Sequence, residues 1–218
     1  MKIALVIGAS GLTGSFVLSK LFSNNKFNKV LAITRKPLNI RHPKLENIIY
    51  DFDLLSEIEN NLKADVYFCC LGSTIKKAGS KYAFKQSDYE YPLKFASLAQ
   101  KNKAVFVLVS AMGANPNSSI FYNKVKGLTE KDILALNNTK TYILRPSLIL
   151  GPRKESRFGE DIAKLVFKYI NFLFVGTFKK YKAIQAETIA QAMINIAAKE
   201  PAEIIIENDK IFEWALKN

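Results

Sequence analysis

Short apolar runs alternate with longer segments of mixed polar and apolar residues through the first two-thirds of the chain. The runs 3–7 and 105–109 are almost wholly apolar, which is typical of strands buried on both faces of a sheet. The pattern predicts strands at 2–7, 29–34, 46–50, 65–71, 104–110 and 140–145, and helices at 13–24, 54–62, 80–102 and 118–137. Strands and helices in alternation predict an α/β fold with a doubly wound parallel sheet, that is, a Rossmann fold.

The pattern changes after Gly151-Pro152, where a charged loop leads into an apolar and aromatic stretch. We expect helices at 160–170, 187–199 and 210–216 and a short strand at 204–206. The chain is predicted to be a single nucleotide-binding domain, 1–218, in which 151–218 forms a small C-terminal cap on the substrate side. The aromatic run 171–178 would serve as core or as the wall of an apolar pocket, and a membrane-touching face is the alternative.

Length and composition agree with one domain, because 218 residues that are 49% hydrophobic can build a large core. The N-terminal apolar run ends in glycine too early for a signal peptide, and no apolar run reaches the length of a membrane span. Cys69 and Cys70 lie inside an apolar run, so we expect buried thiols in a reducing compartment. These features predict a soluble cytoplasmic protein. The single histidine, His42, argues against a catalytic zinc ion, and no metal site is predicted.

The formal net charge of +13 comes mostly from lysines that are scattered along the whole chain. Proteins that bind nucleic acid usually concentrate their positive charge on one face or in one segment. We therefore expect no nucleic-acid partner. A solvated basic surface that attracts anionic small molecules is consistent with this distribution.

The clearest candidate for a ligand site is a glycine-rich turn that follows the first predicted strand. Three glycines at a spacing of three lead directly into the first predicted helix. Glycine allows a sharp turn and a close approach of the backbone to a pyrophosphate, and the helix start offers free N–H groups. The strand before the glycines and the helix after them are the context that a dinucleotide-binding loop requires. The residues predicted to hold the phosphates are Gly8, Ser10, Gly11, Leu12, Thr13 and Gly14.

The residues after the second and third predicted strands indicate which dinucleotide would bind. The second strand is followed by Arg35 rather than by a carboxylate. An acidic residue there binds the ribose hydroxyls of NAD, whereas an arginine accommodates the 2′-phosphate of NADP through its forked donors. We therefore expect NADP(H) rather than NAD(H). Asp51, with Phe52 beside it in the predicted cofactor site, is placed to accept from the adenine amino group, and Asp53 is expected to cap the following helix.

A candidate proton-transfer set follows the fifth predicted strand. Tyr122 and Lys126 are four residues apart on a predicted helix and so share one face, and Ser110 ends the strand twelve residues before the tyrosine. A free tyrosine holds its proton too tightly at neutral pH, and a nearby ammonium favours the phenolate. We expect Tyr122 to donate or accept the proton, Ser110 to bind the substrate oxygen, and Lys126 to assist the tyrosine and hold the nicotinamide ribose.

The glycine loop and these three side chains resemble the short-chain dehydrogenase/reductase superfamily. Further segments are similar to its atypical Tat-interacting-protein-like oxidoreductases: Cys69-Cys-Leu-Gly-Ser-Thr-Ile-Lys-Lys-Ala-Gly79, Asp88-Tyr89, and Leu144-Arg-Pro-Ser-Leu-Ile-Leu-Gly-Pro-Arg-Lys-Glu-Ser-Arg-Phe-Gly-Glu160. Ser110-Ala111-Met112 stands where many of these relatives carry several hydroxyl residues.

The resemblance implies a Rossmann domain with bound NADPH and the set Ser110, Tyr122 and Lys126. It implies further cofactor contacts from the loop after the fourth strand and from the segment near the nicotinamide, namely Leu71, Gly72, Pro146 and Leu148. Arg153 and Arg157 would face the substrate cleft, with salt bridges to Glu155 or Glu160 as an equal alternative.

The leading functional prediction is an NADP(H)-dependent oxidoreductase that acts on a carbonyl or alcohol group of a small molecule with an apolar part. The alternative is a redox-sensing regulator that binds NADPH and a partner protein without turnover, because the family is mixed in this respect. An epimerase or dehydratase of sugar nucleotides ranks lower, since such enzymes usually have a longer C-terminal domain. A homodimer or a protein partner is left open.

Overall fold

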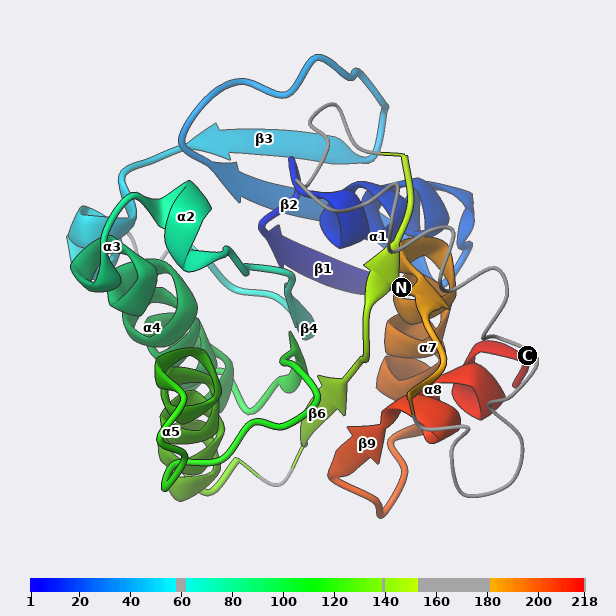
Figure 1. Ribbon diagram of the computed structural model, residues 1–218. Coiled ribbons are helices and arrows are strands. Elements are labelled where there is room, and N and C mark those ends of the chain that lie inside the picture. The colour runs from blue at the N-terminus through cyan, green and yellow to red at the C-terminus, as the bar shows by residue number, and fades with distance from the viewer. Residues whose placement is uncertain (58–61, 139, 153–180, 218) are drawn as a thin grey trace.

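The computed structural model describes residues 1–57, 62–138, 140–152 and 181–217. A seven-stranded sheet in the order β3-β2-β1-β4-β5-β6-β9 forms its centre (Figure 1), and every pairing within it is parallel. The strands are β1 Lys2–Ile7, β2 Phe27–Thr34, β3 Leu45–Ile49, β4 Val66–Cys69, β5 Val105–Val109, β6 Thr141–Arg145 and β9 Ile205–Glu207. The predicted Rossmann-type α/β fold is confirmed.

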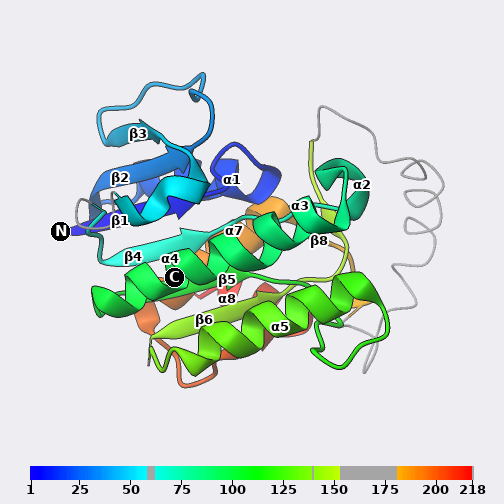
Figure 2. The ribbon, with the colours of Figure 1, turned by 90° about the vertical axis from the view of Figure 1, so that its left-hand side faces the viewer.

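Helices cover both faces of the sheet. One face carries α1 (Leu12–Ser23), α7 (Ala186–Lys199) and α8 (Asn208–Ala215), and the other carries α4 (Tyr91–Lys101) and α5 (Phe121–Ala135), as Figure 2 shows. Successive side chains of a strand point to opposite faces, so both sets are buried. In β1, for example, Ala4 and Val6 belong to the core under α1 and α7, while Leu5 and Ile7 belong to the core under α4. This double burial explains why the strands are continuous apolar runs in the sequence.

The predicted helix 80–102 is confirmed as one continuous helical segment, made of α3 (Lys81–Lys85), a π-helical turn, Gln86–Glu90, and α4. A short helix that was not predicted, α2 (Ile75–Ala78), precedes it. The side chains of Thr74 and Ser80 cap the starts of α2 and α3 by accepting backbone N–H groups. A π-helical turn is rare and occurs frequently at functional sites, so its position near the carboxyl edge of the sheet points to a site there.

The predicted helix 54–62 is a 3-10 helix, Phe52–Glu57, and residues 58–61 lie outside the described part. The side chain of Asp51 accepts the N–H of Asp53 at 3.0 Å, so Asp51 satisfies the start of this turn. The predicted capping role of Asp53 is therefore wrong: the turn begins two residues earlier than the sequence pattern indicated. The Asp53 carboxylate instead accepts the Tyr91 hydroxyl at 2.9 Å.

The C-terminal third contributes to the sheet and its layers. The helices and strand expected near 187–216 are present as α7, β9 and α8, and β9 pairs with β6 at the edge of the sheet. A small separate sheet pairs β7 (Ile149–Leu150) with β8 (Ile184–Gln185), which are too short to give a sequence pattern. The predicted helix 160–170 and aromatic run 171–178 lie outside the described residues, so the substrate-side cap over 151–218 stays a prediction. In the part described, no helix is both long and apolar enough to cross a membrane.

Candidate functional site

The loops after β1, β4, β5 and β6 leave the parallel sheet at the same carboxyl edge. They carry most of the residues predicted from the sequence. Ligands of open α/β sheets bind at this edge, where the strand order reverses. Here the reversal lies between β1, which leads outward to β2 and β3, and β4, which leads outward to β5 and β6. The candidate site is therefore centred on the loops after β1 and β4.

The glycine loop has no room for side chains at two of its positions. Gly8 has a φ of 73°, and a Cβ there would lie 2.5 Å from the backbone oxygen of Cys70. A Cβ on Gly14 would lie 2.2 Å from the backbone oxygen of Gly8. These distances are far below van der Waals contact, so glycine is required at both positions. Glycine at these positions lets the loop turn sharply and pack closely against the neighbouring backbone, as the phosphate-binding loop of this fold requires.

The start of α1 offers backbone N–H groups. Gly11 occupies the N-cap position, provides no side-chain cap and is followed by no acidic residue in the first turn. The N–H groups of Leu12, Thr13 and Gly14 therefore have no side-chain acceptor from the cap. Together with the positive end of the helix dipole, they form a site suited to a phosphate.

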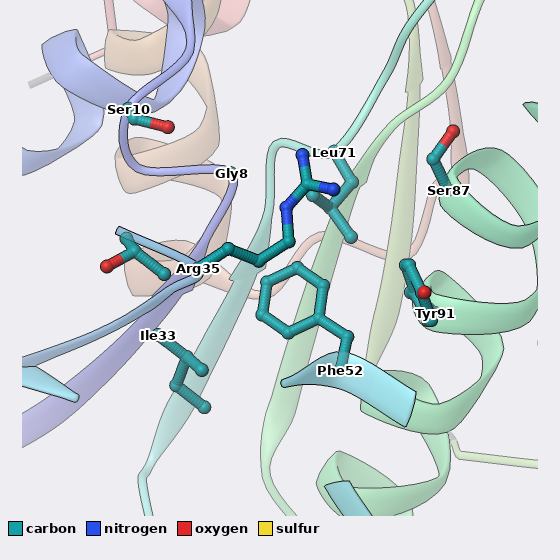
Figure 3. A pocket seen from close by; sticks show the side chains of 9 residues that line it. Gly8, Ser10, Ile33, Arg35, Phe52, Leu71, Ser87 and Tyr91 are labelled. Carbon is teal, nitrogen blue, oxygen red and sulfur yellow. The ribbon is translucent and has the colours of Figure 1, made fainter. Parts of the chain in front are cut away.

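A pocket lies beside the glycine loop, between the ends of β1 and β2, the loop after β4 and the start of α4 (Figure 3). Sequence reasoning predicted five of its lining residues: Gly8, Ser10, Arg35, Phe52 and Leu71. Sequence reasoning missed Ile33, Thr34, Ser87 and Tyr91. Ser87 and Tyr91 lie in a helical segment, where no motif distinguishes a pocket residue from an ordinary helical one.

The side chain of Arg35 extends across this pocket toward Leu71, above the ring of Phe52 (Figure 3). Among the described residues, no carboxylate forms an ion pair with Arg35. Phe52 packs edge-on against Tyr91, with ring centroids 5.2 Å apart. Burial, and after it the hydrogen bond to Asp53, raise the pKa of Tyr91 to about 12. The pocket thus combines a cation with an aromatic wall whose phenol is neutral at physiological pH.

Tyr122 and Lys126 lie one turn apart on α5. Lys126 is buried, with 4% of its surface exposed, and its Nζ lies 2.7 Å from Oδ1 of Asp88. Tyr122 is half-buried, with its ring centroid 5.5 Å from that of Phe84. Burial alone would lower the pKa of Lys126, but the charge of Asp88 and then Tyr122 hold this pKa above its usual value. An ammonium that persists beside a tyrosine can promote proton transfer by that tyrosine.

Asp88 was quoted from the sequence only as part of a family pattern, and its charge had no predicted role. It belongs to the π-helical turn and is fully buried. Its carboxylate accepts the backbone N–H of Ser73 at 3.1 and 3.3 Å and the hydroxyl of Ser87 at 2.7 Å, in addition to its contact with Lys126. This carboxylate joins the loop after β4 to α5.

Ser110 is buried at the end of β5, and its hydroxyl donates to Oε1 of Glu130. Glu130 in turn forms a two-pronged ion pair with Arg145, which also contacts Glu207 at 3.1 Å. Glu130 follows Tyr122 by eight residues, which corresponds to about 12 Å along a helix axis. The structure therefore brings Ser110 into a buried ionic network, and its predicted contact with a substrate oxygen stays a prediction.

We expect Ser110→Ala to destabilise the fold, because it removes a charge-assisted hydrogen bond inside a buried network. The expected decrease in the free energy of unfolding is about 1–3 kcal/mol, measured by urea denaturation. Ser97→Ala, at a half-buried position of α4, is the control and should change stability little. Unchanged stability of Ser110→Ala would mean that the hydroxyl does not contribute to the network.

The segment after β6, which contains the predicted cofactor residues Pro146 and Leu148, is fixed at the same edge. The backbone oxygen of Pro146 accepts the N–H of Met112 at 2.9 Å, and that of Leu148 accepts the N–H of Ile184 at 2.9 Å. The buried side chain of Asn208 accepts the N–H of Ser147 at 3.0 Å. Arg153 and Arg157 lie outside the described residues. Within the described part, no cluster of three or more His, Cys, Asp or Glu side chains could hold a metal ion.

The fold and the glycine loop define a Rossmann-fold protein with a glycine-rich loop of the dinucleotide-binding type. Protein HTATIP2 of Rattus norvegicus is 34% identical to this chain over 199 residues, which are 89% of this chain and 80% of that protein. A protein of Debaryomyces hansenii called FMP52, mitochondrial, is 34% identical over 202 residues, or 90% of this chain and 88% of that protein. The chain belongs to the HTATIP2/FMP52 family, which confirms the resemblance drawn from the sequence. No protein-family model matches it.

Solved structures show the same fold at low sequence identity. The Helicobacter pylori ADP-L-glycero-D-manno-heptose-6-epimerase superposes with a TM-score of 0.69 and 17% identity, over 94% of this chain and 75% of that chain. MoeE5 in complex with UDP-glucose and NAD superposes with a TM-score of 0.67 and 15% identity, over 93% and 74%. Both similarities are similarities of fold.

Proposed function

We propose that this chain is an NADP(H)-dependent oxidoreductase that reduces a carbonyl group or oxidises an alcohol of a small molecule. The observation that supports this most directly is the buried ammonium of Lys126, one helical turn from Tyr122 at the carboxyl edge of the sheet. A buried charge is costly unless it is paired. Its retention beside a hydroxyl that can transfer a proton favours a catalytic site over a purely structural one.

The residues present fit a dinucleotide. The backbone cradle of Gly8 and Gly14 and the free N–H groups at the start of α1 would hold the diphosphate. Phe52 and Leu71 would contact the adenosine half, and Asp51 would accept from the adenine amino group. Gly72, Lys126, Pro146 and Leu148 would face the nicotinamide half. The complex of MoeE5 with NAD supports a dinucleotide in this fold.

In this proposal the nicotinamide supplies or receives the hydride, and the chain manages the proton. Tyr122 would donate a proton to the substrate oxygen in reduction and take it back in oxidation. Lys126 would favour the deprotonated tyrosine and bind the nicotinamide ribose. Because the hydrogen of Ser110 is donated to Glu130, Ser110 would meet a substrate hydroxyl as an acceptor. The substrate would be a small molecule with an apolar part.

The preference for NADP(H) is tested at Arg35, which we expect to bind the 2′-phosphate. Arg35→Ala should raise the Kd for NADPH roughly 10- to 100-fold, the value of one charge-assisted hydrogen bond, and leave the Kd for NADH nearly unchanged. Isothermal titration measures both constants, and Lys36→Ala, at the adjacent exposed position, is the control. Tighter binding of NADH than of NADPH by the natural chain would contradict this role.

The reaction is tested by following NADPH consumption with a panel of aldehydes, ketones and quinones. UDP-glucose is added to the panel because MoeE5 was solved in complex with it. Consumption with a carbonyl compound supports the proposal. Tight NADPH binding without turnover would favour a nucleotide-sensing protein that binds a partner protein or a second copy of itself. The buried hydroxyl of Ser110, which donates to Glu130, favours this second function.

The predicted cytoplasmic location is tested by cell fractionation, since some relatives carry the word mitochondrial in their names.

A further inference from the structure

Asp88 lies where three segments from different parts of the chain meet. It belongs to the π-helical turn, its partner Lys126 belongs to α5, and the N–H that it accepts belongs to Ser73 in the loop after β4. A Cβ on Gly72 would lie 3.8 Å from Nζ of Lys126 and 3.9 Å from Oδ1 of Asp88. The loop after β4, which is predicted to run along the cofactor, therefore lies directly against the ion pair of Asp88 and Lys126.

The surroundings of Lys126 make it dependent on this carboxylate. Both side chains of the pair are almost completely removed from water, with 5% of Lys126 and none of Asp88 exposed. The other titratable groups that act on Lys126 are Tyr122 on its own helix and Cys69 on β4. Burial raises the pKa of the Cys69 thiol to about 12, so this thiol is neutral at physiological pH and provides no counter-charge. The nearby Glu130 is engaged by Arg145.

We infer that Asp88 is a positioning residue for the proposed reaction: it keeps Lys126 charged and holds it between Tyr122 and the loop after β4. The inference rests on the proposed function only in giving Lys126 a catalytic role. Since the same carboxylate accepts the N–H of Ser73, the position of the loop and the position of the ammonium are linked. A π-helical turn suits this task because its wider coil redirects one side chain inward without ending the helix.

The test is Asp88→Asn, which keeps the shape of the side chain and an oxygen for the N–H of Ser73 but removes the charge. The pKa of Lys126 is raised in the intact protein, so its ammonium persists to a higher pH than that of an ordinary lysine. Without Asp88, burial dominates, and Lys126 should lose its proton roughly 1–3 pH units lower. NMR of labelled lysine side chains measures this titration in the protein without cofactor. The alkaline limb of the activity profile should move to lower pH in the same variant.

Asp132→Asn is the matched control. Asp132 lies on α5, as Lys126 does, accepts the hydroxyl of Tyr89 at 2.7 Å, and belongs to no predicted site. An unchanged Lys126 titration in Asp88→Asn, or an equal shift in Asp132→Asn, would overturn the inference. If Asp88→Asn does not fold, the natural chain provides the measurement: a neutral Lys126 amine between about pH 6 and pH 10 would also overturn it. These readouts need no turnover, so they separate a failure of this inference from a failure of the proposed reaction.

Discussion

Replacing Tyr122 with phenylalanine is expected to lower kcat/KM for NADPH-dependent carbonyl reduction by about 100- to 10,000-fold, which is the usual contribution of a positioned acid or base. The substitution removes the hydroxyl and keeps the ring that packs against Phe84 at a centroid distance of 5.5 Å. NADPH affinity should therefore remain close to that of the natural chain. Steady-state kinetics with the best carbonyl substrate, together with isothermal titration of NADPH, would measure the two effects separately.

Tyr82→Phe is the matched control for this experiment. Tyr82 lies on α3, is 69% exposed and donates no hydrogen bond to a carboxylate among the described residues, so its loss should leave kcat/KM unchanged. If Tyr122→Phe retained full turnover, Tyr122 could not be the proton donor. Another acid near Lys126 would then have to supply the proton.

Replacing Gly14 with alanine is expected to have the second large effect. The new Cβ would lie 2.2 Å from the oxygen of Gly8, 2.8 Å from its carbonyl carbon and 2.9 Å from Cα of Ala9. All three are backbone atoms, so α1 or the glycine loop must shift. We expect a loss of about 1–3 kcal/mol in the free energy of unfolding, as for other overpacked sites, and loss of measurable NADPH binding. Thermal unfolding with and without NADPH would report both.

Gly11→Ala is the comparison variant, because it also replaces a glycine of the loop but causes a much milder contact than Gly14→Ala. A Cβ on Gly11 would lie 3.1 Å from the oxygen of Gly8, and the φ of Gly11 is −80°, which alanine adopts freely. This variant should lose less stability than Gly14→Ala, because the one close contact requires only a small shift of the Gly8 carbonyl. It should bind NADPH more weakly than the natural chain, because the methyl group is added at the helix start. Normal NADPH binding by Gly14→Ala would contradict the assignment of this loop to the diphosphate.

The sequence was sufficient for most of the fold because strands buried on both faces are apolar throughout. The runs ending at Ile7 and Val109 could be recognised without any partner, and glycines between a strand and a helix have a well-defined meaning. The sequence did not reveal the π-helical turn, because a single wider turn changes the spacing of apolar residues along a helix too little to be recognised. It also could not show that the strand near Ile205 would join the sheet beside β6.

The ionic contacts of the site were beyond sequence reasoning for a different reason. Asp88 and Lys126 are 38 residues apart, and Ser110 reaches Glu130 across two elements. Such pairs depend on how helices are set against the sheet, which local patterns do not specify. The segment Ser110-Ala111-Met112 was a partial signal, because it has one hydroxyl side chain where many relatives have several. That one hydroxyl donates its hydrogen bond to Glu130 inside the protein.

The pairing of β9 with β6 has a consequence for how the chain is made. β6 ends at Arg145, whereas its outer neighbour begins at Ile205, so about sixty residues must leave the ribosome before this edge is covered. Until then the nascent chain presents an unpaired strand that other polypeptides can extend. The N-terminal half, whose strands β1 to β4 pair with one another, can meanwhile assemble first. The glycine loop is therefore synthesised early, and the β6 border of the sheet is covered last.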